Sequence, residues 1–356
     1  MKAVTVVGAR PQFIKAAPVS RILRQKHTEI LVHTGQHYDD NMSAVFFDEL
    51  DIPEPDCNLG IGSGSHGAQT GAMLAAIEQV LVKEQPDWVL VYGDTNSTLA
   101  GALAAAKIHI KIAHVEAGLR SFNRAMPEEI NRVLADHLSD LLFCPSQTAA
   151  DNLKAEGITR GVRVVGDVMA DALAYAVERA GDRSQILQKL GLAPKKYLLV
   201  TVHRAENTDD HERLANILSA LNALTEIVVF PVHPRTRSVI EKLNYAVNSH
   251  VLMIEPVGYL DMVQLEQSAR LILTDSGGIQ KEAYWLSIPC ITLRDETEWV
   301  ETVQAGWNVL VGANTDAIVR AVRSFKPPVS HDVLYGDGKA SERIKLAFYK
   351  DIFSQE

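Results

Sequence analysis

Short apolar runs rich in β-branched residues alternate with longer helical patterns along nearly the whole chain, and this alternation constrains the fold most strongly. In the first half the expected strands are residues 3–7, 30–33, 88–92, 112–115 and 141–144, and the expected helices are 18–25, 71–82, 98–107 and 128–138. Apolar strands separated by helices are typical of a parallel sheet covered on both faces. The pattern therefore predicts a doubly wound α/β fold.

A second series of the same kind follows in the second half of the chain. Its expected strands are residues 197–202, 227–231, 251–254, 271–274 and 290–293, and its expected helices are 211–224, 237–242, 260–268, 279–286 and 315–324. We place the first domain at residues 1–167 and the second at 168–338, with the junction within 165–188. Two such domains leave an inter-domain cleft at their strand ends, where sheets of this kind bind ligands.

Charge and cysteine content exclude several classes of protein. The 35 Lys and Arg residues against 44 Asp and Glu residues give a net charge of −9, which disfavours a nucleic-acid or anionic-membrane partner. Three widely spaced cysteines, Cys57, Cys144 and Cys290, form no C-x-x-C pair, so we expect a reducing cytoplasm and no cysteine-ligated metal. No apolar stretch approaches the roughly 18 residues of a membrane-spanning helix.

The first motif with chemistry is the glycine turn after the first strand, Gly8-Ala-Arg-Pro-Gln-Phe-Ile-Lys15. Backbone N–H groups at the start of a helix favour an anion, and Arg10 with Lys15 would add positive charge. The segment is neither a Walker loop nor G-x-G-x-x-G, and the alternative is that both cations are solvated surface charges.

A second turn of this type is Thr274-Asp-Ser-Gly-Gly-Ile-Gln-Lys-Glu282. The bare N–H groups of Gly277 and Gly278, with the Ser276 hydroxyl, suit a diphosphate, and Glu282 two turns later suits a ribose diol. The alternative is a plain strand-to-helix turn in which Ser276 caps the helix and Glu282 lies on a solvated face.

Three acids follow predicted strands or begin a predicted helix. Asp94 and Glu116 come after two consecutive strands, and Glu128 stands at a helix start. Acids in one cleft are candidates for proton transfer, and mutual repulsion or nearby Arg120 or Arg132 can tune their pKa values. A turn cap for Asp94 and a favourable helix-dipole position for Glu128 are the structural alternatives.

Basic groups line the start of the second domain. His203 follows its first strand, and His233 and Arg235 follow the next. A histidine there can pair with a phosphate, although a lone histidine is more often structural. The twelve histidines contain no H-E-x-x-H motif, so we expect no metal and no other cofactor.

Taken together, these motifs resemble the non-hydrolysing UDP-N-acetylglucosamine 2-epimerase family in order and spacing over nearly the whole chain. The motifs are Gly8-Ala-Arg-Pro, Tyr92-Gly-Asp-Thr-Asn-Ser-Thr, His114-Val-Glu-Ala-Gly-Leu-Arg, Met126-Pro-Glu-Glu-Ile-Asn-Arg, His203-Arg-Ala-Glu-Asn and Thr274-Asp-Ser-Gly-Gly-Ile-Gln-Lys-Glu. The resemblance implies a GT-B fold of two Rossmann-like domains, with a C-terminal helix at 339–356 rejoining the first domain. It also implies a homodimer that uses neither nicotinamide nor metal.

The resemblance further implies removal of the proton on sugar carbon 2, loss of UDP to give a bound glycal, and re-addition with the proton on the opposite face. The implied catalytic residues are Asp94, Glu116, Glu128 and His203. The implied substrate-binding residues are Arg10, Lys15, Arg132, His233, Ser276, Gly277, Gly278, Glu282 and Trp299. Such chemistry fits carboxylates near an unactivated proton, with cations and N–H donors for the departing UDP.

Two departures favour one branch of the family. Members that act on UDP-GlcNAc commonly have Glu where this chain has Gln12, and Thr-Glu-Arg-Pro-Glu where it has Thr297-Glu-Trp-Val-Glu301. Both segments are more similar to the branch that epimerises UDP-2,3-diacetamido-2,3-dideoxyglucuronic acid. A neutral Gln12 would remove repulsion toward a sugar carboxylate, and Trp299 would reshape the pocket wall.

Other functions stay open at this stage. Bacterial members of the family use an activator site. Of its residues Gln36 and His37 remain here, whereas the segment Ser65-His-Gly-Ala-Gln69 departs from the family pattern. UDP-GlcNAc is the alternative substrate. A hydrolysing epimerase, a GT-B glycosyltransferase and a non-catalytic nucleotide-sugar sensor are the competing classes.

Overall fold

The computed structural model describes residues 1–35 and 49–353. The chain divides into two compact units, which are described separately below. Unit 1 is Met1–Tyr175 together with Tyr335–Glu356, and unit 2 is Ala176–Leu334.

Unit 1 contains a seven-stranded sheet with the order β3-β2-β1-β4-β5-β6-β7, in which every pair of neighbours is parallel. Its strands are β1 (Lys2–Val7), β2 (Thr28–His33), β3 (Cys57–Asn58), β4 (Trp88–Tyr92), β5 (Lys111–Val115), β6 (Leu141–Cys144) and β7 (Val162–Val164). Its helices are α1 (Arg10–Leu23), α3 (His66–Glu84), α4 (Asn96–Lys107), α5 (Pro127–Leu138), α6 (Gln147–Ala155) and α16 (Ala340–Phe353).

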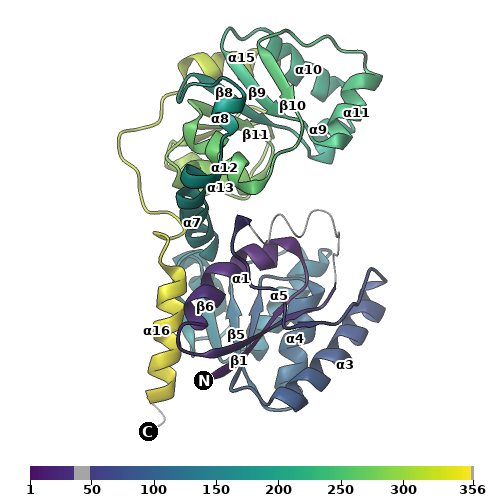
Figure 1. Cartoon of the computed structure of the whole chain (residues 1–356), viewed down its shortest axis with the longest axis vertical. Coiled ribbons are helices and arrows are strands. Elements are labelled where there is room, and N and C mark those ends of the chain that lie inside the picture. The colour runs from purple at the N-terminus through teal and green to yellow at the C-terminus, as the bar shows by residue number, and fades with distance from the viewer. Residues whose placement is uncertain (36–48, 354–356) are drawn as a thin grey trace. The chain divides into compact units, whose positions relative to one another are not determined.

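The core of unit 1 follows from strands that are apolar on both faces. β4 is buried along its whole length, and Val89 and Val91 pack with Met73 and Ile77 of α3. The C-terminal helix α16 lies along α1, as Figure 1 shows. Its Phe348 is fully buried, with its ring centroid 5.2 Å from that of Trp88.

Unit 2 repeats the design with a six-stranded parallel sheet of order β10-β9-β8-β11-β12-β13. Its strands are β8 (Tyr197–Thr201), β9 (Ile227–Pro231), β10 (Val251–Ile254), β11 (Leu271–Thr274), β12 (Cys290–Thr292) and β13 (Asn308–Leu310). Its helices are α8 (Ile186–Lys189), α9 (Ala205–Thr208), α10 (His211–Asn222), α11 (Pro234–Lys242), α12 (Tyr259–Ser268), α13 (Gly277–Trp285), α14 (Val300–Gln304) and α15 (Thr315–Ser324).

The segment expected as the junction is helical. Helix α7 (Val168–Arg183) runs through the boundary between the units at Tyr175 and Ala176. The Asp167 side chain accepts a hydrogen bond of 2.8 Å from the Met169 N–H, which is the geometry of a helix N-cap. The alanine-rich sequence that follows favours continuation of the helix.

Helix α1 begins earlier than its predicted start at residue 18. It starts at Arg10, because Pro11 fits the first turn of a helix, where its missing N–H has no intrahelical acceptor. Pro18 then lies inside the helix rather than at its start.

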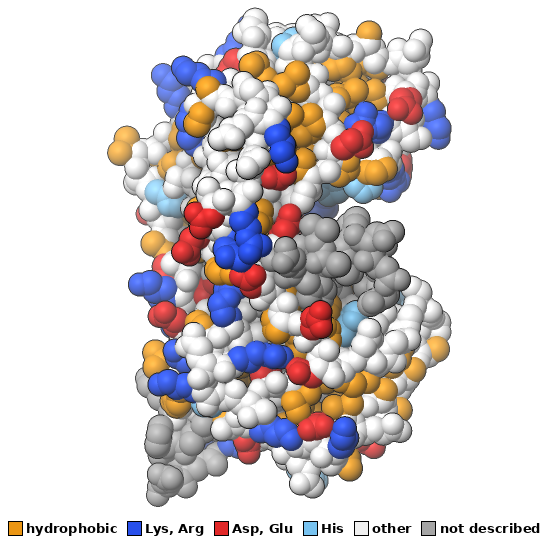
Figure 2. Space-filling view, in the orientation of Figure 1, with side chains coloured by type: hydrophobic (Ala, Val, Ile, Leu, Met, Phe, Trp, Pro, Cys, Tyr) orange, Lys and Arg blue, Asp and Glu red, His pale blue; other side chains and the backbone are white. Residues whose placement is uncertain are grey.

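The surface carries charges of both signs. On the face drawn in Figure 2, Lys and Arg side chains are interspersed with Asp and Glu side chains. Within residues 1–35 and 49–353, no helix is both long and apolar enough to cross a membrane.

Candidate functional site

Both sheets reverse their strand order at one point, and the predicted motifs follow the strands on either side of it. In unit 1 the reversal lies at β1, with β2 on one side and β4 on the other. In unit 2 it lies at β8, between β9 and β11. Open α/β sheets bind ligands outside the carboxyl ends of the strands at such points. Arg10 follows β1 as the first residue of α1, and its side chain is exposed.

Glu116 and Lys15 form an ion pair at the carboxyl edge of the unit 1 sheet, with both side chains largely buried. Burial alone lowers the pKa of Lys15, but the charge and hydrogen bond of Glu116 outweigh it and raise the pKa above its usual value. Gly93 makes room for this pair, since a Cβ there would lie 3.1 Å from Glu116 Oε2. Glu116 itself has a φ of 73°, a strained conformation for a residue with a side chain.

Asp94 is the second acid of this edge, and it is held by α5. Arg132 pairs with the Asp94 carboxylate, and Asn131 Nδ2 donates a 2.9 Å hydrogen bond to the Asp94 carbonyl. Asp94 and Glu116 leave neighbouring strands whose last residues, Tyr92 and Val115, are register partners. Two carboxylates, each paired with a cation, therefore lie at adjacent strand ends.

Glu128 differs from these two acids, because it lies exposed in the first turn of α5. The buried acid of this turn is Glu129, to which the sequence assigned no role. Glu129 accepts three 2.9 Å hydrogen bonds from Ser121 and Phe122. Burial raises the pKa of Glu129, but these donors and Arg132 outweigh burial, and the net pKa is lowered. Glu129 thus anchors the 121–122 segment as a carboxylate.

Arg120 does not pair with the three acids. Its guanidinium binds Asp136 at 2.7 Å and forms two further hydrogen bonds with Glu156, at 2.7 and 2.8 Å. Of the two arginines proposed to tune the acids, only Arg132 contacts one of them, Asp94.

Gln12 is 2% exposed, and its amide is committed to the backbone of unit 1. Its oxygen accepts hydrogen bonds from the N–H groups of Gly8 (2.8 Å) and Ala9 (3.1 Å). Its nitrogen donates to the Tyr92 carbonyl (2.7 Å) and to Thr98 Oγ1 (3.0 Å). The Gln12 amide thus ties the first turn of α1 to β4, and its effect on a sugar carboxylate stays a prediction.

In unit 2 the centre of the switch point is Asp275, a fully buried acid that directly follows β11. It accepts hydrogen bonds from the N–H groups of His203 (3.1 Å) and Arg204 (3.0 Å) and from Asn207 Nδ2 (3.1 Å). The His203 ring lies beside it, with Nδ1 3.5 Å from Asp275 Oδ1 and a half-exposed side chain. The sequence analysis included Asp275 in a motif but assigned it no role. Its position between a predicted strand and Ser-Gly-Gly could have marked it as a functional residue.

Ser276 stands at the N-cap of α13, yet its side chain makes no capping hydrogen bond to this helix. The Ser276 hydroxyl is therefore not the helix cap that the alternative interpretation expected. At the start of α6, by contrast, the Ser146 side chain does cap the helix. Gly277 and Gly278 supply the next two amides. A Cβ on Gly277 would lie 3.0 Å from Trp299 Nε1, so the indole closes over this turn. Lys281 Nζ lies 4.2 Å from the Trp299 ring centroid, within the range of a cation–π interaction.

Glu282 is buried rather than on a solvated face, and it accepts a 2.9 Å hydrogen bond from the Tyr259 hydroxyl. Burial raises the pKa of Glu282. Glu266 of α12 is fully buried behind it, and none of the described residues forms a hydrogen bond with either of its carboxyl oxygens. Burial, with the charge of Glu282, raises the pKa of Glu266 well above its usual range.

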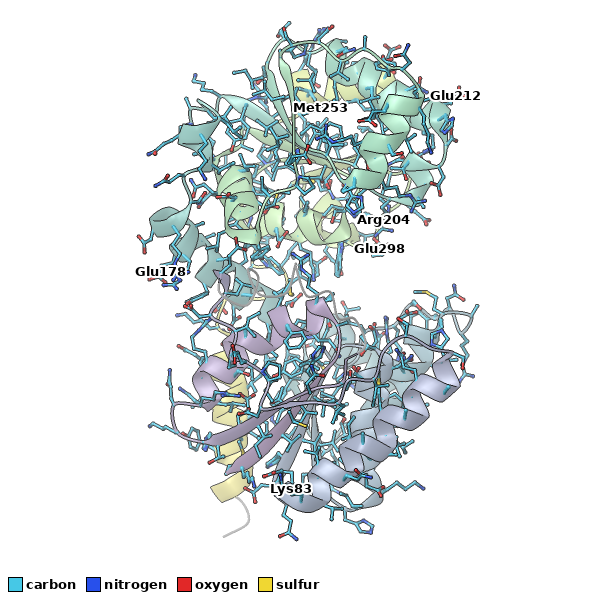
Figure 3. The ribbon with its side chains drawn as sticks, turned by 45° about the vertical axis from the view of Figure 1, so that its right-hand side comes forward. Lys83, Glu178, Arg204, Glu212, Met253 and Glu298 are labelled. Carbon is cyan, nitrogen blue, oxygen red and sulfur yellow. The ribbon has the colours of Figure 1, made fainter. Side chains whose placement is uncertain are left out.

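Several basic groups at the rim of unit 2 already have acidic partners. Arg235 forms a 2.7 Å ion pair with Asp209. Arg204 lies 3.8 Å from Glu298, and Figure 3 labels the two side chains side by side. His233 caps α11, with Nδ1 accepting a 3.2 Å hydrogen bond from the Arg235 N–H.

The residues considered for an activator site are only partly described. Gln36 and His37 lie outside the described residues. Gln69 is buried, where it donates to the Gly62 carbonyl (3.0 Å) and accepts from Asn96 (2.8 Å). In the described parts of the chain, no three His, Cys, Asp or Glu side chains gather as a metal site.

Two parallel sheets with ligand motifs at both switch points define a GT-B fold, and a calicheamicin glycosyltransferase of 13% identity shares it with a TM-score of 0.56. The chain belongs to the UDP-N-acetylglucosamine 2-epimerase family, whose model matches residues 21–348. It is thus a UDP-sugar 2-epimerase, an isomerase.

Three relatives show the extent of the similarity. The chain is 57% identical to a UDP-N-acetylglucosamine 2-epimerase homolog of Methanococcus maripaludis, over 97% of this chain and 98% of that protein. It is 54% identical, with the same coverage, to the UDP-2,3-diacetamido-2,3-dideoxy-D-glucuronate 2-epimerase of Pseudomonas aeruginosa. The UDP-GlcNAc 2-epimerase of Methanocaldococcus jannaschii, solved with UDP-GlcNAc and UDP, is 46% identical with a TM-score of 0.82, over 98% and 100% of the two chains.

Proposed function

We propose that this enzyme inverts carbon 2 of UDP-2,3-diacetamido-2,3-dideoxyglucuronic acid by eliminating and re-adding UDP. The observation that supports it most is the pair of cation-bound carboxylates, Glu116 with Lys15 and Asp94 with Arg132, at adjacent strand ends of unit 1. A proton next to an acetal carbon is weakly acidic, so its removal requires a carboxylate in direct contact.

In the proposed reaction one carboxylate takes the proton from carbon 2. The bond from carbon 1 to the UDP oxygen breaks, the electron pair leaves on the diphosphate, and a double bond forms between carbons 1 and 2. A second acid then delivers a proton to the other face of carbon 2 as the diphosphate oxygen re-adds to carbon 1. We assign these transfers to Asp94, Glu116 and Glu128, with His203 beside the diphosphate.

Unit 2 holds UDP in this proposal, through His233, Ser276, Gly277, Gly278, Glu282 and Trp299. Unit 1 contributes three further contacts of the nucleotide sugar, Arg10, Lys15 and Arg132. Support comes from the start of α13, where three first-turn amides have no acceptor within their own helix. The Ser276 hydroxyl, which does not cap this helix, adds a donor beside them. The Glu282 carboxyl suits a ribose diol.

The choice of substrate rests on two supports. One is the 54% identity to the diacetamido-glucuronate enzyme, against 46% to the M. jannaschii UDP-GlcNAc enzyme. The other is Trp299, which stands where UDP-GlcNAc enzymes commonly have Arg and which packs over Gly277. The alternative, UDP-GlcNAc to UDP-ManNAc, is favoured by the 57% identity to a UDP-N-acetylglucosamine 2-epimerase homolog.

Turnover of both UDP-sugars by the purified enzyme, side by side, tests the assignment. We expect the diacetamido-uronate to have the higher kcat/KM. A Trp299→Arg variant should shift the ratio toward UDP-GlcNAc, because it restores the residue common in that branch. A wild-type preference for UDP-GlcNAc would contradict the substrate assignment and leave the reaction type intact.

A homodimer is also part of the proposal. It is supported by exposed apolar side chains on α5, Ile130 (47% exposed) and Leu134 (45%), and at its N-cap, Met126 (39%). Phe122 (75%), in the segment before the helix, is exposed as well. Residues four apart lie on one face of a helix, and exposed apolar faces of this kind mark interaction surfaces. Ile130→Asp should give a monomer in sedimentation velocity, whereas Val329→Asp, at a fully exposed valine, should not. A monomeric wild type would refute the dimer.

A cytoplasmic location completes the proposal. It is supported by the three cysteines, all of which are free thiols. Burial raises the pKa of Cys144 and of Cys290 to about 12, so both stay protonated and unreactive at neutral pH.

A further inference from the structure

The buried histidine of β5, His114, has both ring nitrogens in short hydrogen bonds, and the proposed reaction gives it no task. The side chain is completely buried. Nδ1 lies 2.7 Å from Asp136 Oδ1, and Nε2 lies 2.7 Å from the Gly93 carbonyl oxygen.

The chemistry of these two partners fixes the protonation of the ring. A backbone carbonyl only accepts hydrogen bonds, so Nε2 carries a proton. Asp136 accepts from Gly118 N–H (3.1 Å) and from Arg120 Nη1 (2.7 Å), as an ionised carboxylate does. Nδ1 therefore donates as well, and His114 is an imidazolium. Burial lowers the pKa of His114, but Asp136 and the Gly93 carbonyl outweigh burial and raise the net value.

Further charged residues hold Asp136, the acidic partner of His114. Asp136 binds Arg120, and Arg120 binds Glu156 through two nitrogens. The chain from Glu156 to His114 thus contains two negative and two positive charges and is neutral overall. A neutral, fully hydrogen-bonded network can be buried without leaving an unpaired charge.

On the other side the imidazolium holds the peptide that links Gly93 to Asp94. Gly93 has a φ of +61°, and its N–H donates a 3.0 Å hydrogen bond to the Val115 carbonyl. Its carbonyl, fixed by His114, sets the plane of the peptide that leads into Asp94. Asn131 fixes the next carbonyl, that of Asp94. The same glycine packs against the Glu116 carboxylate.

We propose that His114 is a positioning residue for epimerisation: its Nε2–H hydrogen bond to the Gly93 carbonyl fixes the peptide that sets Asp94 against Glu116. The inference rests on the proposed roles of these two acids. It predicts an effect on chemistry rather than on substrate binding, because the hydrogen bond aligns reacting groups and does not touch the ligand.

Three substitutions separate the hydrogen bond from the charge. The amide nitrogen of His114→Gln reaches the position of Nε2, whereas that of His114→Asn reaches only the position of Nδ1. Asp136→Asn removes both charges of the pair and preserves every hydrogen bond: its oxygen accepts from Gly118 and Arg120, and its NH₂ donates to Nδ1 of a neutral His114 that still donates from Nε2.

We expect kcat to fall about 100-fold in His114→Asn, since a displacement near 1 Å at reacting groups has that effect. His114→Gln should retain at least about tenfold more activity than His114→Asn, and Asp136→Asn should stay within about fivefold of wild type. KM should remain within about threefold in all three, and deuterium exchange at carbon 2 should fall in parallel with kcat. Thermal unfolding confirms that each variant is folded.

Equal losses of kcat in His114→Gln and His114→Asn would overturn the inference. A loss of kcat in Asp136→Asn as large as that in His114→Asn would overturn it as well. Because His114→Gln keeps the hydrogen bond to Gly93 and His114→Asn keeps the one to Asp136, their comparison decides even if both are less stable than wild type. A wild-type enzyme that turns over neither UDP-sugar would instead contradict the proposed function, and the inference with it.

Discussion

The switch points of the two sheets occupy the same place in the same topology, yet they present different chemistry. At the unit 1 edge the functional groups are side-chain charges, with Glu116 bound to Lys15 and Asp94 to Arg132. At the unit 2 edge they are the first backbone amides of α13, which lie next to the buried Asp275 in the chain. In the proposed function, the first edge exchanges protons and the second holds an anion.

This difference teaches how an acidic chain can be expected to bind an anionic substrate. The net charge of −9 works against capture of a nucleotide sugar at long range. Amides at a helix start attract a diphosphate locally without adding a titratable group. The acids needed for chemistry can then stand at the other edge, where Lys15 and Arg132 offset their charge. If this division holds, variants of Asp94 or Glu116 should change kcat, and variants at the start of α13 should change affinity.

The largest effect is expected for Glu116→Gln, which keeps the shape of the side chain and removes its basicity. We expect kcat to fall about 10³-fold with KM within about threefold, since a positioned acid or base contributes in this range. Initial rates of epimerisation at saturating UDP-sugar measure it. Glu178→Gln, at an exposed position on α7 labelled in Figure 3, is the matched control and should be unchanged. A kcat within tenfold of wild type would remove Glu116 from the reaction.

A smaller effect of a different kind is expected for Gly277→Ala. Its Cβ would meet Trp299 Nε1 at 3.0 Å and would cover the first amides of α13. We expect affinity for UDP, measured by titration calorimetry, to fall about tenfold, or 1.4 kcal/mol. Gly181→Ala on α7, where a Cβ meets no other atom within 4 Å, is the control. Unchanged UDP affinity with reduced kcat would break the division between the two edges.

The smallest effect concerns stability and pH in unit 2. The pKa of Glu266 is raised by burial, so its favourable, protonated form is fully present below the ordinary carboxyl pKa and is lost as pH rises through the raised value. The Tm of Glu266→Gln should therefore equal that of wild type near pH 5 and exceed it near pH 9. The shift should be about 2–4 °C for each kcal/mol. Parallel Tm curves for the two proteins across this range would show that Glu266 is not the group lost at alkaline pH.

The sequence predicted the regular elements well, because a buried parallel strand must be apolar throughout. β4, β6, β9, β10 and β11 begin and end at the predicted residues. Helix α1 was started too late, since Pro18 was treated as a first residue when Pro11 already occupied that role.

The sequence predicted at which strand ends the candidate site lies, but not the buried contacts that hold its residues in place. Glu128 and Glu129 are adjacent in sequence, and a helix turns about 100° per residue, so only the fold decides which of them is buried. Gln12 and Asp275 bind partners 68 to 86 residues away, which no local pattern encodes. The buried pair of His114 and Asp136 likewise joins β5 to α5 over 22 residues.

Solvent exchange at carbon 2 tests the central claim most directly. The wild-type enzyme and Glu116→Gln are incubated with the UDP-diacetamido-uronate in D₂O, and the sugar is followed by proton NMR and mass spectrometry. We predict one deuterium at carbon 2 of the epimerised UDP-sugar from wild type, no accumulation of free sugar, and exchange reduced about 10³-fold in the variant. An epimer that retains hydrogen at carbon 2, or release of free sugar as the main product, would contradict elimination and re-addition of UDP.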